Sequence, residues 1–414
     1  LEKSPGEVWY PDEDVWQCIV DVTFAEFNAQ SGTAEVEGVK KGSVMEAREA
    51  LQYAIARGRG PDVITPFGPA HLPELVEGGH LLALDTYAQQ YGWEKEMVPW
   101  ALEHGRVDGL LYSLPVELKT FVLWYNKALF EEHGWEPPTS MDELIALAEE
   151  IDGAGIIPFA GGTSECPACL EWYFGEFVSH IAGPEKVYQA LNGEIPWTDP
   201  AFVRSIETWK EMMQKGYWMG GVDRFFDASF DEFSSAFAAG EAAMNLEGTW
   251  FLGRIPEYFG EGHENDWDWV PFPSATGEAI FSLDIGGTRS LDRDSRDPQA
   301  AAEWLTYEFS PEVQARILMD CGVAPAPVRI EASMLEELDP RIARLYGEFA
   351  KAQAENNYGY TVWNFWTLNS GTYIWEKMQR VLTDRLTVED FLEGLDKVYA
   401  KDLADGLRPP LPER

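Results

Sequence analysis

The stretch SLPVELKTFVLWYNKALFEEHGWEPPTSMDELIALAEEI, residues 113–151, does most to decide the fold. Its first part predicts a strand, a turn, a longer strand and a helix, because short apolar runs are followed by a helical spacing of apolar residues. Ser140 then stands three residues before Glu143, which is the pattern of a capping box opening an amphipathic helix. The stretch therefore predicts strands and helices in alternation.

The same alternation extends outward in both directions. Towards the N-terminus, a short strand ends near Pro11, and helices are expected over about 12–29 and 45–56. GPDVITPFG, residues 60–68, predicts a buried strand running into a Gly/Pro loop, where open α/β sheets present residues to ligands. Later helices are expected over about 167–182, 200–215, 229–239, 298–321, 339–356 and 371–400. The predicted class is α/β.

Length and charge narrow the function. A chain of 414 residues exceeds the size at which one core stops growing, so two domains or two interleaved lobes are expected. There are 71 acidic and 31 basic residues, giving a formal net charge of −40. Such a field repels phosphate backbones and anionic lipids, which argues against nucleic-acid binding. We interpret the charge as a solubility feature rather than as recognition of a cationic ligand.

The N-terminus and the cysteines bear on location. No run is apolar and long enough for a membrane-spanning helix, and the lack of an initial Met leads us to expect a mature form trimmed of a signal or lipid anchor. The histidines form no cluster with the cysteines, so no metal site is expected. A short-loop disulfide between Cys166 and Cys169 suits an extracytoplasmic protein better than a redox role, although the oxidation state of all four cysteines stays open.

Five segments, in this order, resemble the maltose-type extracellular solute-binding proteins of ABC sugar importers. They are residues 60–85, 113–151, 237–255 (FAAGEAAMNLEGTWFLGRI), 267–278 (WDWVPFPSATGE) and 286–326. The combination of YNKALF, PPTSMDEL and the F-x-x-G-E-A-A-M pattern is highly specific, whereas any single piece is weak. The resemblance covers nearly the whole chain and is weakest over 1–55 and 330–365.

The resemblance implies a two-lobed clamshell in which each lobe is a sheet flanked by helices and the chain crosses the hinge several times. By analogy, residues 1–117 and 285–327 form the first lobe, and residues 118–284 and 328–414 form the second. The ligand would lie between the lobes and be enclosed when they close, as is physically sensible for small ligands. On this assignment Cys18 and Cys321 share the first lobe, so two disulfides within lobes are possible.

Tryptophan, tyrosine and phenylalanine at turns and loop edges are the candidate ligand contacts, because a sugar ring has an apolar C–H face and a polar rim. Trp250 falls where the family commonly carries a tryptophan that stacks on sugar, and Tyr173 falls where it places another aromatic residue. For both, ligand contact is favoured over core packing. Trp363 and Trp366 are equally suited to a platform or to the core.

Polar candidates lie at the expected crossings. The resemblance places hydrogen-bonding groups near Glu117 and Lys119, and which of the two faces the ligand stays open. Asp284 is weighed evenly between accepting two sugar hydroxyls and forming a hinge salt bridge, and Glu247 is a further acceptor beside Trp250. The remaining candidates are aromatic residues at turns: Tyr10, Phe67, Trp172 and Trp218.

Two function classes remain. The first is a non-catalytic receptor for a sugar, more readily a di- or oligosaccharide, acting as a monomer outside the cytoplasm and delivering its ligand to an ABC transporter permease without a cofactor. The second is a glycoside hydrolase using paired carboxylates from Glu117, Glu171, Glu247 or Asp284. Phosphate-binding, dinucleotide-binding, nucleophile-elbow and zinc-protease motifs are missing. A receptor for a non-sugar solute is a third alternative. The ordered segments favour the sugar receptor.

Overall fold

The computed structural model describes residues 4–10, 12, 14–42, 44–65 and 68–414. They form two compact units. Unit 1 contains residues 1–119, 284–338 and 407–413, and unit 2 contains residues 120–283, 339–406 and 414. The chain therefore passes between the units repeatedly. The lobes expected from the resemblance differ from these units at residues 118–119, 284, 328–338 and 407–413, which were expected in the second lobe and belong to unit 1.

Unit 1 is built on a sheet in which β1 pairs in parallel with β2 and β3, while β11 pairs antiparallel with β3 and β6. Its strands are β1 (Ser4–Tyr10), β2 (Ala34–Lys40), β3 (Val63–Ile64), the β4–β5 hairpin (Arg106–Val107 and Leu110–Leu111), β6 (Leu114–Lys119) and the later part of β11 (Phe281–Leu291). Its helices are α1 (Asp14–Gln30), α2 (Val44–Ile55), α3 (Leu72–Glu77), α4 (Asp85–Tyr91), α5 (Trp93–Glu96), α6 (Pro99–Glu103), α14 (Pro298–Glu308) and α15 (Pro311–Cys321), with 3-10 turns at Pro69–His71 and Ala332–Leu335.

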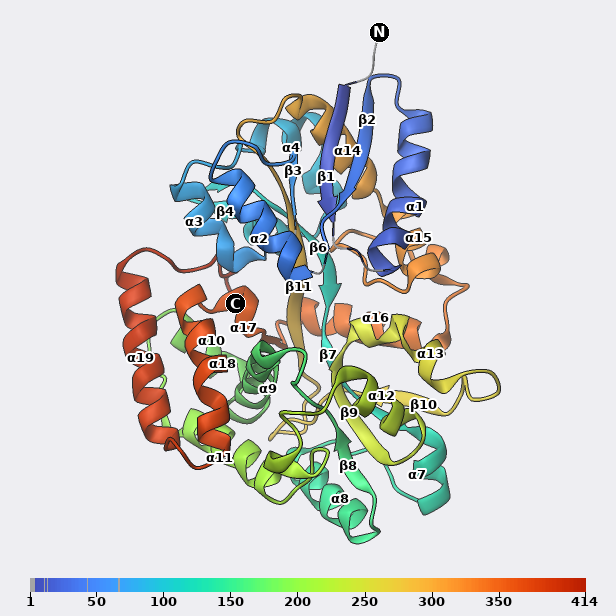
Figure 1. Ribbon diagram of the computed structural model, residues 1–414, viewed down its shortest axis with the longest axis vertical. Helices are drawn as coiled ribbons and strands as arrows, with labels where there is room; N and C mark the ends of the chain where they lie inside the picture. Colours follow the sequence, from blue (N-terminus) through green and yellow to red (C-terminus); the bar gives the residue numbers. More distant parts are fainter. Residues whose placement is uncertain (1–3, 11, 13, 43, 66–67) are drawn as a thin grey trace. The chain divides into compact units, whose positions relative to one another are not determined.

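Unit 2 is built on a four-stranded sheet in the order β10-β7-β9-β8 (Figure 1). Its strands are β7 (Phe121–Asn126), β8 (Ile157–Ala160), β9 (Ala242–Gly248), β10 (Trp267–Val270), the first residues of β11, and β12 (Tyr358–Tyr360). Its helices are α7 (Lys127–His133), α8 (Met141–Gly153), α9 (Leu170–Phe177), α10 (Pro184–Leu191), α11 (Pro200–Gln214), α12 (Phe230–Ala238), α13 (Ile255–Phe259), α16 (Pro340–Ala354), α17 (Val362–Phe365), α18 (Leu368–Leu382) and α19 (Val388–Ala404). Shorter helical turns are η2 (Pro167–Cys169), η3 (Val178–Ala182), η4 (Gly221–Asp223) and η5 (Thr249–Gly253). The expected α/β class is confirmed.

The two central strands of unit 2 are buried on both faces. Every residue of β9 is buried, and β7 pairs with it antiparallel, Phe121 opposite Gly248 and Tyr125 opposite Met244. Continuous apolar runs of this kind are expected where helices cover a sheet on both sides. The predicted helix after Ser140 is confirmed as α8, whose first turn is closed by the Ser140 hydroxyl accepting from the Glu143 amide at 3.3 Å.

Two predicted helices are each broken in the structure. The expected helix over 298–321 is α14 and α15, separated at Phe309 and Ser310, because Pro311 has no amide hydrogen to continue a helix and instead begins the next one. The expected helix over 371–400 is α18 and α19. Thr387 ends the break by accepting from the Asp390 amide at 3.0 Å. In both places the spacing of apolar residues predicted one continuous helix where the structure has two.

All four cysteines form disulfides. Cys18 on α1 is bonded to Cys321 at the end of α15, with 5.8 Å between their Cα atoms, and the two are separated by 303 residues in sequence. Cys166 is bonded to Cys169, three residues away, immediately before α9. Both bridges lie within single units, as the sequence had left possible.

The two bridges should differ in their effect on stability, because cross-linking a long loop removes more freedom from the unfolded chain. We expect Cys18→Ser combined with Cys321→Ser to lower the free energy of unfolding of unit 1 by about 2–4 kcal/mol. The matched pair Cys166→Ser and Cys169→Ser should cost clearly less. Thermal and denaturant unfolding of both double variants measure this, and equal losses would contradict it.

Candidate functional site

Three tryptophans from distant parts of the sequence meet in unit 2. Trp172 lies in the first turn of α9, Trp250 in η5 directly after β9, and Trp363 in α17. All three indoles are half-buried, while Phe121, the first residue of β7, is buried beside them at 1% exposure. We call Trp172, Trp250, Trp363 and Phe121 the tryptophan cluster.

The rings of the tryptophan cluster meet mainly at their edges. The Phe121 ring lies 5.0 Å from the Trp250 ring at an interplanar angle of 89°, and 5.9 Å from the rings of both Trp172 and Trp363. Trp172 lies 4.9 Å from Trp250 and 6.1 Å from Trp363, at angles of 59° and 63°. In these contacts the edge of one ring meets or tilts towards the face of another, so the four side chains form one continuous aromatic group whose three indoles are only half-buried.

A carboxylate accompanies the tryptophan cluster. Glu171 precedes Trp172 and is half-buried. A side chain on Gly371, near the start of α18, would lie only 3.5 Å from a Glu171 carboxyl oxygen. The carboxylate is thus close to the N-terminal turn of a helix, where the helix dipole favours negative charge. Glu171 therefore supplies a carboxylate near the first turn of α18, one residue along the chain from Trp172.

The chain around Trp250 behaves as its sequence indicates. The buried strand β9 ends at Gly248, and the turn that follows is fastened to the neighbouring chain. The Thr249 amide donates to the Thr120 carbonyl at 2.9 Å, and the Thr120 amide donates to the Thr249 hydroxyl at 3.4 Å. Trp250 therefore leaves the sheet at a backbone position that two hydrogen bonds hold.

Glu247 lies beneath this turn. Its side chain is 2% exposed, and burial raises the pKa of its carboxyl to about 8, although a hydrogen bond from the Trp250 side chain opposes the shift. The positive charge of Arg254 also lowers the pKa of this carboxyl. At this burial Glu247 contacts Trp250 and not the surrounding solvent, so its proposed role as a direct acceptor from a ligand stays a prediction that this conformation does not favour.

Three further aromatic candidates lie in the core of unit 2. Tyr173 is 4% exposed and stacks on Trp209 at 5.6 Å, and burial, followed by the nearby Glu247, raises its pKa. Trp218 is fully buried and stacks on Phe159 at 4.3 Å. Trp366 is also fully buried, with Trp197 at 5.1 Å. All three therefore pack in the core of unit 2 in this conformation, and ligand contact at Tyr173 stays a prediction that this burial does not favour.

The polar candidates at the first crossing lie in unit 1. Glu117 on β6 has a left-handed backbone, with φ of 55°, and its carboxylate is 2.5 Å from the Lys119 ammonium. Both side chains lie over Gly286 of β11, where a Cβ would be 2.3 Å from the Glu117 carboxylate. Asp284, which pairs in register with Lys119, is 1% exposed. A positive φ at a non-glycine residue beside a partly exposed ion pair is the kind of strain that functional sites carry.

A further candidate, Tyr10, also lies in unit 1. Tyr10 on β1 is 7% exposed, and its ring occupies the space beside Gly38 of β2, where a Cβ would be 2.8 Å away. Tyr10 is therefore a packing residue in this conformation. Its neighbour Trp9 is half-buried, and the Lys41 ammonium lies 3.7 Å above its ring. Phe67 lies outside the described residues.

Sequence reasoning missed Phe121. This residue contacts all three indoles, yet in the sequence it is one apolar residue at the start of a buried strand, like many others. Phe121 reaches the indoles because β7 pairs with β9 in one particular register, and that register could not be predicted from the sequence alone. Trp172, Trp250 and Trp363 were among the predicted site residues, and the structure brings them together, although their contact with a ligand stays a prediction.

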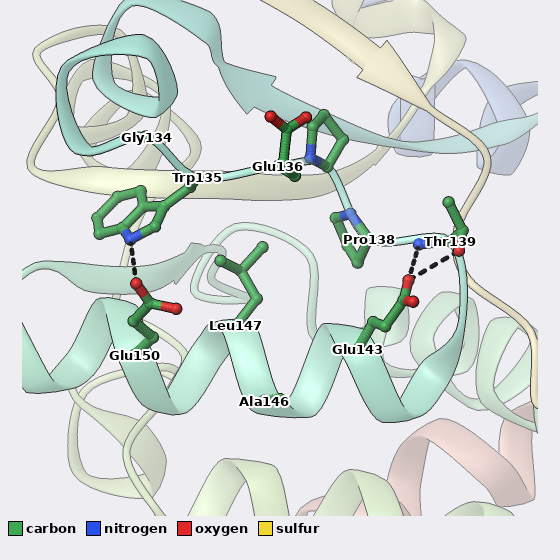
Figure 2. Close-up of a pocket in the computed structure, with 10 residues that line it drawn as sticks. Gly134, Trp135, Glu136, Pro138, Thr139, Glu143, Ala146, Leu147 and Glu150 are labelled. Atoms are coloured by element: carbon green, nitrogen blue, oxygen red, sulfur yellow. Dashed lines mark hydrogen bonds between the residues drawn. The ribbon is translucent and has the colours of Figure 1, made fainter.

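A separate cavity of about 570 Å³ lies at the turn between α7 and α8 (Figure 2). Trp135 lines it, with its indole nitrogen donating to the Glu150 carboxylate at 3.1 Å, and Glu143 accepts from the Thr139 amide and hydroxyl. No residue of the tryptophan cluster lines this cavity. Unit 2 therefore has a second place where a small ligand could bind, and binding experiments need a control variant in this cavity.

Over the part of the chain that the structure describes, no group of three or more His, Cys, Asp and Glu residues is placed to hold a metal ion. Within the same residues, every helix is too short or too polar to cross a bilayer.

The buried Glu247 makes the stability of the protein depend on pH. The pKa of Glu247 is about 8 in the folded state, whereas an ordinary glutamate carboxyl has a pKa of 4.5. Between these pH values the folded state therefore keeps a proton that the unfolded chain releases. The free energy of unfolding should therefore fall as pH rises from about 5 to 8. Glu247→Gln should lose less stability over this range than the wild type does.

Denaturant unfolding at a series of pH values measures the difference between the two proteins. Glu241→Gln is the matched control, because Glu241 is exposed and directly precedes β9. A pH dependence that is the same for the wild type and Glu247→Gln would contradict the prediction.

The chain has many relatives among known proteins. The family described as bacterial extracellular solute-binding protein matches residues 20–315. An uncharacterized ABC transporter extracellular-binding protein of Pyrococcus horikoshii is 25% identical over 76% of this chain and 71% of its own length. A probable sugar-binding periplasmic protein of Brucella melitensis is 26% identical over 70% of this chain and 66% of its own length.

Solved structures share the fold. A chitin oligosaccharide binding protein superposes with a TM-score of 0.80 at 21% identity, covering 97% of this chain and 99% of its own. The sugar-binding protein MalE of Xanthomonas citri superposes with a TM-score of 0.72 at 20% identity, covering 97% and 98%. The family resemblance read from the ordered sequence segments is confirmed, and the chain belongs to the bacterial extracellular solute-binding protein family.

Proposed function

We propose that this protein is a carbohydrate receptor of an ABC importer and that the tryptophan cluster is its sugar platform. One observation carries the proposal. Three half-buried indoles from α9, η5 and α17 meet on one buried phenylalanine, so partly exposed aromatic surface from three separate elements lies together. The apolar C–H face of a sugar ring packs on such a surface, and hydroxyl groups at its rim take hydrogen bonds from neighbouring polar groups.

Relatives support the same ligand class. Several of them carry the description probable sugar-binding periplasmic protein, and one is described as an alpha-glucosides-binding periplasmic protein. Structures with the same fold include one in complex with raffinose and one with acarbose. Three indoles offer more apolar face than a single sugar ring covers, so we propose a di- or oligosaccharide.

The polar half of recognition is proposed to come from carboxylates. Glu171 lies next to Trp172 in unit 2, and the Glu117–Lys119 ion pair of unit 1 is 12% and 18% exposed at its side chains. A carboxylate accepts hydrogen bonds from two neighbouring hydroxyls, as a sugar presents them. Ligand would settle on the tryptophan cluster first, and groups of unit 1 would complete its hydrogen bonds.

The delivery step follows from family membership. We propose that the protein acts outside the cytoplasm, as a monomer, and hands its sugar to the permease subunits of an ABC transporter. The relatives are solute-binding proteins and not enzymes. A non-catalytic role is proposed for this chain on that ground, and two of the hydrolase candidates, Glu247 and Asp284, are 2% and 1% exposed.

A thermal-shift screen against a library of mono- and oligosaccharides tests the function, because a ligand that binds only the folded state raises its apparent stability. We expect at least one di- or oligosaccharide to raise the melting temperature. Trp250→Ala, Trp172→Ala and Trp363→Ala should each weaken binding of that sugar by about 1–3 kcal/mol, as expected for loss of an aromatic contact.

Trp135→Ala is the matched control, since Trp135 lines the separate cavity of unit 2. If this variant loses sugar affinity while the variants of the tryptophan cluster keep it, the platform is wrongly placed. Release of reducing sugar from a glycoside, lost in Glu117→Gln or Asp284→Asn, would favour the hydrolase alternative. Stabilisation by non-sugar solutes only would favour a different receptor.

Closure on the ligand stays a prediction. If only the ligand-bound closed state makes contacts from both units, sugar binding should shift the population towards it. Small-angle scattering should then record a smaller radius of gyration with the bound sugar than without it. An unchanged radius at saturating sugar would contradict closure while leaving sugar binding itself intact.

A further inference from the structure

The four residues Glu247, Gly248, Thr249 and Trp250 form one structural unit, which we call the EGTW turn. Trp250 supplies the indole, and its backbone is fixed through Thr249. Glu247 and Gly248 are both buried and so have almost no surface with which to contact a ligand. The Glu247 side chain and the absence of a side chain at Gly248 nevertheless bear directly on where the indole lies.

Gly248 leaves the space that the indole occupies. A Cβ built on Gly248 would lie 2.1, 2.3 and 2.4 Å from three atoms of the six-membered ring of Trp250, far closer than atoms of side chains approach. The backbone of Gly248 is ordinary, with φ of −75° and ψ of 167°, so any residue could adopt it. Glycine is therefore required here by the indole and not by the fold of the strand.

Glu247 acts on the Trp250 side chain through its carboxyl. The Trp250 side chain, whose donor is the indole N–H, lies close enough to the Glu247 carboxyl to lower its pKa against the effect of burial. Glu247 is itself held in β9, opposite Val122, and its carbonyl accepts from the Trp124 indole at 3.0 Å. The charged and titratable groups that face its carboxyl are Tyr173 from α9 and Arg254 after η5.

From these contacts we propose that Glu247 and Gly248 are positioning residues that set the orientation of the Trp250 indole. Glu247 acts through Trp250 and does not touch the ligand. The proposal rests on the proposed sugar platform for its consequence in binding. Its structural part, the coupling of Glu247 to the indole, is independent of any sugar.

The indole N–H resonance of Trp250 in ¹⁵N-correlated NMR spectra tests the coupling without ligand. Trp250→Phe identifies the resonance by its loss. A carboxylate accepts a stronger hydrogen bond than a neutral carboxyl, so the proton should move downfield as pH rises, with a midpoint near 8. The movement should vanish in Glu247→Gln and persist in the control Glu241→Gln. No movement in the wild type, or the same movement in Glu247→Gln, would overturn the proposal.

Binding gives the second readout, with maltotriose, N,N′-diacetylchitobiose and xylobiose as probes. For a probe that binds the wild type, Gly248→Ala and Glu247→Leu should each weaken affinity at least tenfold, while Glu247→Gln, whose amide oxygen still accepts from the indole, should stay within about threefold. Gly347→Ala is the control, because a Cβ there meets nothing within 4 Å.

The outcomes separate the two proposals. Unchanged affinity and an unchanged indole resonance in a folded Gly248→Ala protein would overturn the positioning role. Should Gly248→Ala fail to fold, the Glu247→Gln and Glu247→Leu pair decides. If no sugar binds the wild type but its indole titrates with Glu247, the positioning role stands and the sugar receptor proposal fails.

Discussion

The pairing of β7 with β9 is the constraint on which the candidate site depends. This antiparallel register sets Phe121 opposite Gly248 and Val122 opposite Glu247. A slip by one residue would turn every side chain of the strand to the other face. Phe121 would then leave the indoles, and Glu247 would leave the space beneath Trp250. The positions of the aromatic side chains therefore depend first on the pairing of the two backbones.

Local signals in the sequence predicted much of this arrangement. The Ser140 and Glu143 pattern located the start of α8. This feature is readable because capping depends on residues close in sequence. The order of such local signals along the chain also carried the family resemblance, which the comparisons confirm.

Features that depend on distant residues were not readable. Trp363 and Trp366 are three residues apart with similar neighbours, yet the first joins the tryptophan cluster and the second is buried beside Trp197. Only the packing of α17 against other elements separates them. Tyr173 was placed by analogy in the site, but α9 turns its side chain into the core, where it stacks on Trp209, while its neighbour Trp172 reaches the cluster. Neighbouring residues of a helix point in different directions, so a shift of one position separates a residue of the cluster from a residue of the core.

The contacts among the three indoles and Phe121 exist in the protein without ligand. Immobilising a flexible side chain on binding costs about 0.5–1.5 kcal/mol, and here folding has already confined these rings. A sugar that settles on them does not need to order them. The same rigidity has an opposite consequence for selectivity. An apolar face distinguishes poorly between sugars that differ in one hydroxyl, so discrimination between stereoisomers falls to the few polar groups around the platform.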